Sequence, residues 1–216
     1  MYVSDKPGSH DFDLLRKLVL SDGSVLRADL PGRPTRDCLF HDPTREDVLL
    51  KIFNRNGAAG VIGVFNARYD KNKDLPPISG HVSPADVLGL RGDRFAMYAH
   101  SSAELRTLTR SDVWELSLPP LTAEVFTIVP IGDHGIAPIG LTDKFNSAGA
   151  VTLHGPRDGG YEITLRGEGP FAAWCASEPS RVQMNGETLP FSYDAATHLL
   201  LITTSRAGIV RIDGLS

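Results

Sequence analysis

The residues best suited to nucleophilic chemistry stand close together near the start of the chain. Cys38 has His41 three positions further on, and a cysteine needs a neighbouring base to become a useful nucleophile. Neighbouring positions do not by themselves give that geometry. Cys38 also lies between Asp37 and the apolar pair Leu39-Phe40, which favours packing. We therefore predict that Cys38 is buried and that it carries no catalysis.

A second chemical candidate is the adjacent pair Arg36-Asp37, within the stretch Pro34–Pro43 that we call the connector. Two prolines restrict the backbone at its ends, so its geometry is specified. One interpretation is a partly buried Arg36–Asp37 ion pair that fixes the connector. The other is a polar contact from these residues to a sugar at the rim of a neighbouring cleft. Both interpretations stay open at this point.

Metal, cofactor and phosphate chemistry find little support in the chain. The seven histidines and the second cysteine, Cys175, show no ligand spacing, and a tightly bound zinc ion needs three or four strong donors. The glycine turns at 57–60 and 158–160 lead into strands, whereas a phosphate loop leads into a helix. We predict no metal site and no cofactor, and we expect Cys175 to pack inside a strand.

The elements that position these residues fall into two kinds. Residues 1–5 are predicted to form a short strand, and Ser9 is predicted to cap an amphipathic helix whose apolar face contains Phe12. This is one strand–helix unit. If it were the last such unit of a β/α barrel, Ser4 and Asp5 would stand at the strand's C-terminal end, where barrel enzymes place their sites. Asp5 is then a substrate-contact candidate, the alternative being a turn or cap residue.

From Asp22-Gly23 onward the pattern becomes that of short strands bounded by Gly, Pro or Asn-Gly, which is typical of an antiparallel β-sandwich. A hairpin is predicted at Asn54–Gly57, and residues 67–93 are predicted to be one long loop. The predicted strands are 25–28, 48–53, 60–65, 94–100, 112–118, 123–129, 151–154, 161–166, 171–175, 181–184, 199–204 and 208–212.

Composition narrows the class of protein. The chain has 216 residues, 41% of them apolar and 22% charged, with a net charge of −4, which suits an ordinary globular core. Dispersed basic residues argue against nucleic acid as a partner. No apolar run is long enough to cross a membrane, and the first residues are unlike a signal peptide. We therefore expect a cytoplasmic protein.

Several longer motifs resemble one known family. They include Tyr2–Gly8, Leu14–Leu20, Pro34–Phe40, Leu50–Asn54, Gly60–Asn66, Ala137–Leu141 and Asn146–Ala150. In consistent order over nearly the whole chain, they resemble the C-terminal part of the raffinose synthase and seed imbibition protein family, which includes alkaline α-galactosidases and is similar to glycoside hydrolase family 36.

The resemblance implies a (β/α)8 catalytic barrel followed by a β-sandwich, with retaining hydrolysis or transfer of α-galactosides by two aspartates. Nothing in the chain matches the motifs that carry those aspartates, so the resemblance implies no catalytic residue here. It places the last barrel strand and helix at residues 1–21 and the sandwich at 22–216. Ser4 and Asp5 would line the substrate end, and the connector would join the two domains.

Two functional hypotheses follow. The chain is either the non-catalytic C-terminal portion of an α-galactoside-acting enzyme, inactive alone, or a free-standing module that binds carbohydrate or completes a separate barrel subunit. The expected partners are a barrel, on the same chain or another, and a galactoside. The apolar face of the N-terminal helix also predicts self-association, or docking of that helix on the sandwich.

Overall fold

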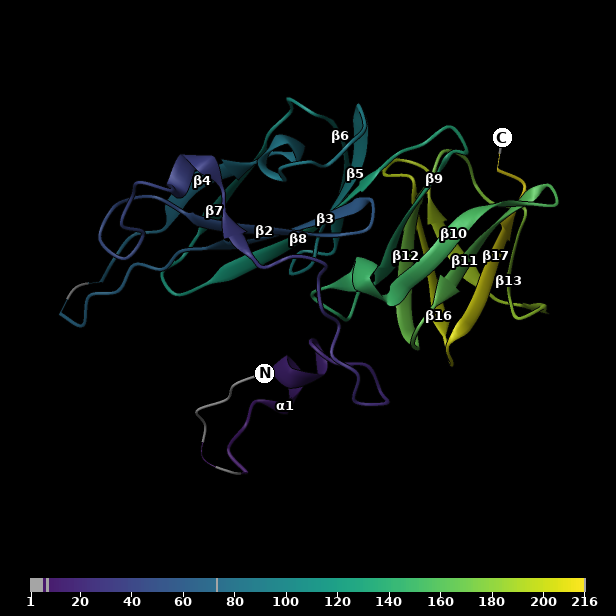
Figure 1. Ribbon diagram of the computed structural model, residues 1–216, viewed down its shortest axis with the longest axis horizontal. Helices are drawn as coiled ribbons and strands as arrows, with labels where there is room; N and C mark the ends of the chain where they lie inside the picture. Colours follow the sequence, from purple (N-terminus) through teal and green to yellow (C-terminus); the bar gives the residue numbers. More distant parts are fainter. Residues whose placement is uncertain (1–5, 7, 73, 216) are drawn as a thin grey trace.

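The computed structural model describes residues 6, 8–72 and 74–215. In this part of the chain antiparallel sheets form two lobes that lie side by side (Figure 1). The mainly β, antiparallel class predicted from the sequence is confirmed. No helix in the described residues has the length and apolar character required to cross a bilayer.

The first lobe is built on a six-stranded sheet in the order β1-β2-β3-β8-β5-β6. A two-stranded sheet, β4-β7, packs across it, and two 3₁₀ turns, η1 and η2, connect its strands. The bounds are β1 Arg33–Pro34, η1 Arg36–Cys38, β2 Leu50–Asn56, β3 Ala59–Phe65, β4 Ile78–Val82, η2 Pro84–Asp86, β5 Arg94–Ala99, β6 Glu104–Thr109, β7 Trp114–Leu118 and β8 Ala123–Pro130.

The second lobe is a sandwich of a five-stranded sheet, β10-β11-β17-β13-β14, and a four-stranded sheet, β15-β16-β12-β9. The 3₁₀ turn η3 stands between β9 and β10. The bounds are β9 Ile136–Leu141, η3 Ser147–Ala150, β10 Val151–Arg157, β11 Gly160–Leu165, β12 Gly169–Cys175, β13 Arg181–Met184, β14 Glu187–Thr188, β15 Phe191–Asp194, β16 Leu199–Thr204 and β17 Gly208–Asp213.

Three apolar clusters hold the lobes together. One lies inside each lobe, and the third lies between them, where Ala96 and Tyr98 of β5 meet Ile139 of β9 and Trp174 of β12. This third cluster explains why β5 and β9 are apolar on both faces, since each is covered on two sides. The predicted sandwich is present, and the six-stranded sheet of the first lobe packs on it.

Some strand predictions were wrong because local composition hid the strand. Residues 67–93 contain β4 and η2 and are therefore not one loop, and β9 was missed because it contains Pro138 and Gly140. Pro138 is tolerated because β9 is an edge strand, where a missing N–H breaks no ladder bond. Strand β6 and the short β14 and β15 were also missed, and residues 25–28 form only a single bridge, Val19–Val25. The predicted hairpin at Asn54–Gly57 is confirmed.

The N-terminal helix is shorter than predicted. Helix α1 spans Phe12–Arg16, and its N-cap is Asp11, whose carboxylate accepts the Leu14 N–H at 2.9 Å, so the Ser9 cap was wrong. The chain leaves the helix after Arg16 and docks on the second lobe: Phe145 N–H donates to the Lys17 carbonyl at 3.0 Å, and Leu20 is buried in that lobe's core. The boundary predicted between residues 21 and 22 stays a prediction.

Candidate functional site

The connector lies against β2 through backbone and side-chain contacts. Pro34 is opposite Ile52 in the β1–β2 ladder, and Thr35 N–H donates to the Lys51 carbonyl at 2.9 Å. The chain then enters η1, which contains both Arg36 and Asp37. The rigid geometry predicted for the connector therefore comes from strand pairing followed by a tight turn.

Lys51 lies at the centre of a charged cluster beneath the connector. Its Nζ is 2.8 Å from Asp37 Oδ2 and 2.9 Å from Asp86 Oδ2, and its side chain is only 3% exposed. It also donates to the His81 carbonyl at 3.2 Å. Asp86 in turn accepts the Ser83 N–H and so caps η2. We call these three residues, Asp37, Lys51 and Asp86, the connector triad.

The pKa values within the triad follow from competition between burial and pairing. Partial burial by itself would raise the pKa of Asp37, but hydrogen bonds from Lys51 and Thr35 outweigh it and leave that pKa lowered. Burial by itself would lower the pKa of Lys51, but its two carboxylate partners raise it overall. Both charges are therefore stabilised at neutral pH, and this arrangement is suited to holding structure.

The expected Arg36–Asp37 ion pair is wrong. Within the described residues Asp37 pairs with Lys51, and Arg36 is exposed with no ion pair. Successive residues of a tight turn project in different directions, so neighbours in sequence do not face each other. The alternative, a sugar contact by Arg36 and Asp37, stays a prediction.

The connector also presents an apolar surface. Phe40 is 95% exposed and Leu39 is 51% exposed, whereas Cys38 beside them is 4% exposed. Leu39 borders a pocket of about 510 Å³, lined by Pro34, Phe53, Ala85, Leu88, Arg33, Arg36, Asp37 and Asp86. The sequence predicted that Cys38-Leu39-Phe40 would be buried together. Only Cys38 is, and we call the exposed Leu39 and Phe40 the connector apolar patch.

The two cysteines are packing residues, as the sequence predicted. Cys38 Sγ lies 3.4 Å from the Thr35 carbonyl oxygen, while His41 pairs with Glu46 at 2.7 Å. Cys175 is fully buried, and burial raises the pKa of its thiol to about 12, so it stays protonated. In the described part of the chain no three His, Cys, Asp or Glu residues gather as a metal site. Ser4 and Asp5 lie outside the described residues, and their predicted role stays a prediction.

A polar seam between the lobes escaped the sequence reasoning. His100 Nε2 lies 2.9 Å from Thr127 Oγ1, which is 2.8 Å from Ser147 Oγ, and Ser147 donates to the Ile139 carbonyl. His100 Nδ1 lies 3.3 Å from the Thr142 carbonyl oxygen. Burial lowers the pKa of His100 to about 4, so its ring is neutral and its single N–H donates to only one of these two oxygens. These hydrogen bonds fasten the first lobe to the second.

The close approach of β9 to η3 depends on a glycine. Gly140 has φ +101, and a Cβ there would lie 2.1 Å from the Ser147 carbonyl oxygen. The family resemblance already rested in part on residues 137–141 and 146–150, so the sequence indicated that both segments matter. That the two segments contact each other in the seam is visible only in the structure.

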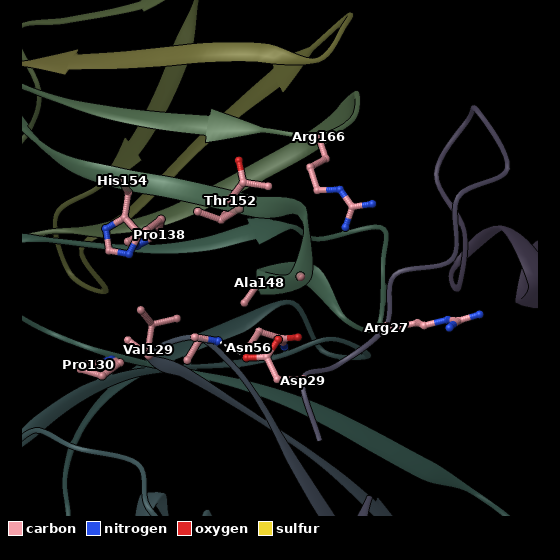
Figure 2. Close-up of a pocket in the computed structure, with 15 residues that line it drawn as sticks. Arg27, Asp29, Asn56, Val129, Pro130, Pro138, Ala148, Thr152, His154 and Arg166 are labelled. Atoms are coloured by element: carbon pink, nitrogen blue, oxygen red, sulfur yellow. Dashed lines mark hydrogen bonds between the residues drawn. The ribbon is translucent and has the colours of Figure 1, made fainter. Parts of the chain in front are cut away.

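A cleft opens beside the seam, between the β2–β3 hairpin of the first lobe and β10 of the second (Figure 2). Its volume is about 400 Å³, and Arg27, Asp29, Asn56, Thr152, His154 and Arg166 supply its polar lining. Apart from the hairpin signal that includes Asn56, no sequence motif singled out these residues, since they come from four separate segments. Only the packing of the lobes brings them together.

Known proteins place the chain in a family. A family model described as "Raffinose synthase or seed imbibition protein Sip1" matches residues 1–204. The chain is 41% identical over 232 residues to the probable galactinol–sucrose galactosyltransferase 1 of Arabidopsis thaliana, covering 94% of this chain and 31% of that protein. It is 36% identical over 221 residues to the galactinol–sucrose galactosyltransferase of Oryza sativa subsp. japonica, covering 90% and 28%.

A third relative, the stachyose synthase of Pisum sativum, is 35% identical over 220 residues, covering 89% of this chain and 26% of that protein. The chain thus spans about three tenths of the length of the curated relatives it matches, in their C-terminal part. The match extends over both lobes, including the connector and the seam. The chain therefore belongs to the raffinose synthase or seed imbibition protein family.

Proposed function

We propose that this chain is the non-catalytic C-terminal portion of an enzyme that hydrolyses α-galactosides or transfers their galactosyl group. A (β/α)8 barrel, on the same polypeptide or on a separate subunit, supplies the two catalytic carboxylates. The names of the relatives, galactinol–sucrose galactosyltransferase and stachyose synthase, make galactinol the proposed donor and a sucrose-containing sugar the proposed acceptor.

The observation that carries this proposal is the connector apolar patch. Phe40 is almost fully exposed on a segment whose backbone is fixed by β2 and by the connector triad. An exposed aromatic side chain next to an exposed leucine that borders a pocket is typical of a surface that a protein partner covers. The rigid support matters because a mobile loop would lose entropy on docking, whereas this segment is already ordered.

We also propose a reducing, cytoplasmic setting. Cys38 and Cys175 are free and buried, and free cysteines without a disulfide framework suit that compartment. Fractionation of the producing cells checks this, and recovery of the chain from an oxidising compartment would contradict it.

The main test uses a chimera and the isolated chain. The barrel portion of the Arabidopsis relative, with its own C-terminal segment replaced by this chain, should release galactose from a chromogenic α-galactoside or transfer it from galactinol to sucrose. The isolated chain should do neither. Hydrolysis by the isolated chain, with preparations free of other galactosidases, would disprove the proposal.

The connector apolar patch can be tested in the same chimera. Phe40→Ser should lower the chimera's activity about tenfold by weakening the contact with the barrel, while leaving the isolated chain's stability within about 0.5 kcal/mol. Val113→Ser is the control, because Val113 is another exposed apolar side chain, half exposed, on a different part of the first lobe. Equal activity of the two variants would show that the patch does not meet the barrel.

A further inference from the structure

The cleft between the lobes has walls from both of them. The β2–β3 hairpin and the end of β8 form one side with Ala59, Val129 and Pro130, and β9 and β10 form the other with Pro138 and Thr152. The segment before β1 closes one end with Asp29. Figure 2 shows the side chains from these elements arranged around the gap. The cleft is therefore a product of lobe packing and not of a single loop.

Several polar groups in the cleft have hydrogen-bond donors or acceptors without a partner in the described part of the chain. The Arg166 guanidinium makes no hydrogen bond or ion pair with any other described residue, and the same holds for Arg27. Asp29 uses one oxygen, Oδ2, to accept the Gly57 N–H and leaves Oδ1 free. His154 uses Nδ1 toward the Tyr161 hydroxyl at 2.6 Å, which fixes the ring and leaves Nε2 available.

These groups have a mixed character that defines the ligand chemistry. Guanidinium groups only donate, the carboxylate only accepts, and the imidazole is neutral because burial lowers the pKa of His154. A hydroxyl group both donates and accepts, so a ligand with several hydroxyls satisfies all three kinds of partner. A simple anion would leave the Asp29 carboxylate facing a like charge.

The apolar lining and the volume of the cleft further limit the class of ligand that fits. Val129, Pro130 and Pro138 give the cleft an apolar surface that suits the C–H face of a sugar ring. The volume of about 400 Å³ accommodates one or two hexose units. The cleft is also held open in advance, because Asn56 and Asn146 hydrogen-bond across the lobes beside it and the seam fixes their relative position.

We propose that the cleft between the lobes binds a neutral saccharide of one or two hexose units, with Arg166, Asp29 and His154 as its polar contacts. All residues that line this site come from this chain, so the proposal does not require an attached barrel. Its test therefore succeeds or fails independently of the proposed enzyme function.

The experiment titrates the isotopically labelled 216-residue chain with methyl α-galactoside and, separately, with sucrose, following backbone amide shifts by NMR. We expect shifts at the β2–β3 hairpin and β10, with a dissociation constant on the order of 1–10 mM for at least one sugar. Arg166→Ala should weaken binding at least tenfold without affecting folding, since Arg166 is exposed and its side chain has no described hydrogen-bond partner. Arg206→Ala, an exposed arginine outside the cleft, is the control and should bind as the wild type does.

A second variant separates the cleft from a general charge effect. Thr152→Trp places a large ring into the cleft from an exposed position on β10, where aromatic residues are well tolerated, and should abolish binding. A sugar concentration of about 50 mM exceeds the expected dissociation constant. Absence of amide shifts with both sugars at that concentration would overturn the proposal. So would equal binding by the wild type and both cleft variants, or binding of phosphate or citrate in the cleft without any sugar.

Discussion

The connector and the seam solve the same problem, fixing one segment against another, with opposite chemistry. The connector uses charge: a buried lysine held between two carboxylates, under a surface that remains exposed. The seam uses neutral hydrogen bonds and close backbone approach, and it is closed to solvent at Thr127 and Ser147. Lys51 is buried as well, but its two carboxylate partners compensate for the desolvation of its charge, whereas His100 in the seam hydrogen-bonds only to neutral oxygens and stays neutral.

This difference teaches which region is available for a partner. The two hydroxyls of the seam, on Thr127 and Ser147, each have two hydrogen-bond partners within the described chain. The connector triad is likewise satisfied, but the Leu39 and Phe40 side chains above it are not covered. A segment that is both rigid and uncovered is the kind that meets another domain with little loss of entropy.

The largest effect is expected at Gly140 in the seam. Gly140→Ala should lower the free energy of unfolding by at least about 4 kcal/mol or prevent folding, because the new Cβ meets the Ser147 carbonyl oxygen at 2.1 Å. Gly186→Ala is the control, with a similar positive φ of +88 but open space around it, and should cost about 1 kcal/mol. Urea unfolding measures both. Similar losses would show that backbone strain, and not the seam contact, explains Gly140.

A smaller effect is expected at the connector triad. Lys51→Met removes the cation and leaves the Asp37 and Asp86 carboxylates facing each other, which should cost about 3 kcal/mol. Arg16→Ala breaks an ion pair of similar length, 2.9 Å, but with both side chains largely exposed, and should cost less than about 1 kcal/mol. If the two variants lost equal stability in urea, the triad would not be what fixes the connector.

The smallest expected effect is a pH dependence of stability, which differs between the seam and the connector. His100 has a folded pKa of about 4 against an ordinary value of 6.5, so the unfolded chain binds more protons between these values and stability falls as pH falls. We expect the His100 contribution to lower the free energy of unfolding by about 2 kcal/mol between pH 7 and pH 5. The Asp37 pKa is lowered below 3.8, so its contribution is present above that value and is lost only at more acidic pH.

A variant assigns this pH dependence to the seam. His100→Asn should be less stable than the wild type at pH 7 and should lose much less further stability down to pH 5. The exposed His81→Asn is the control and should keep the wild-type slope. Unfolding free energies measured at a series of pH values give both slopes, and a wild-type slope in His100→Asn would place the titrating group elsewhere.

Local patterns predicted the strands whose apolar residues alternate or form short β-branched runs. The hairpin at Asn54–Gly57 and most strands of the second lobe were recognised in this way, because turn residues and strand periodicity act over a few residues. Two strands that contain proline or glycine, β4 and β9, were missed, since their pairing partners compensate for poor local propensity.

The sequence by itself determined the antiparallel β class, the packing role of both cysteines and the family, because composition, turn residues and ordered motifs are written along the chain. Only the tertiary structure decided that Asp37 pairs with Lys51, that Phe40 is exposed, and that Arg166, Asp29 and His154 share one cleft. The physical reason is distance along the chain: these contacts join segments tens of residues apart, and no local pattern specifies which of them will meet.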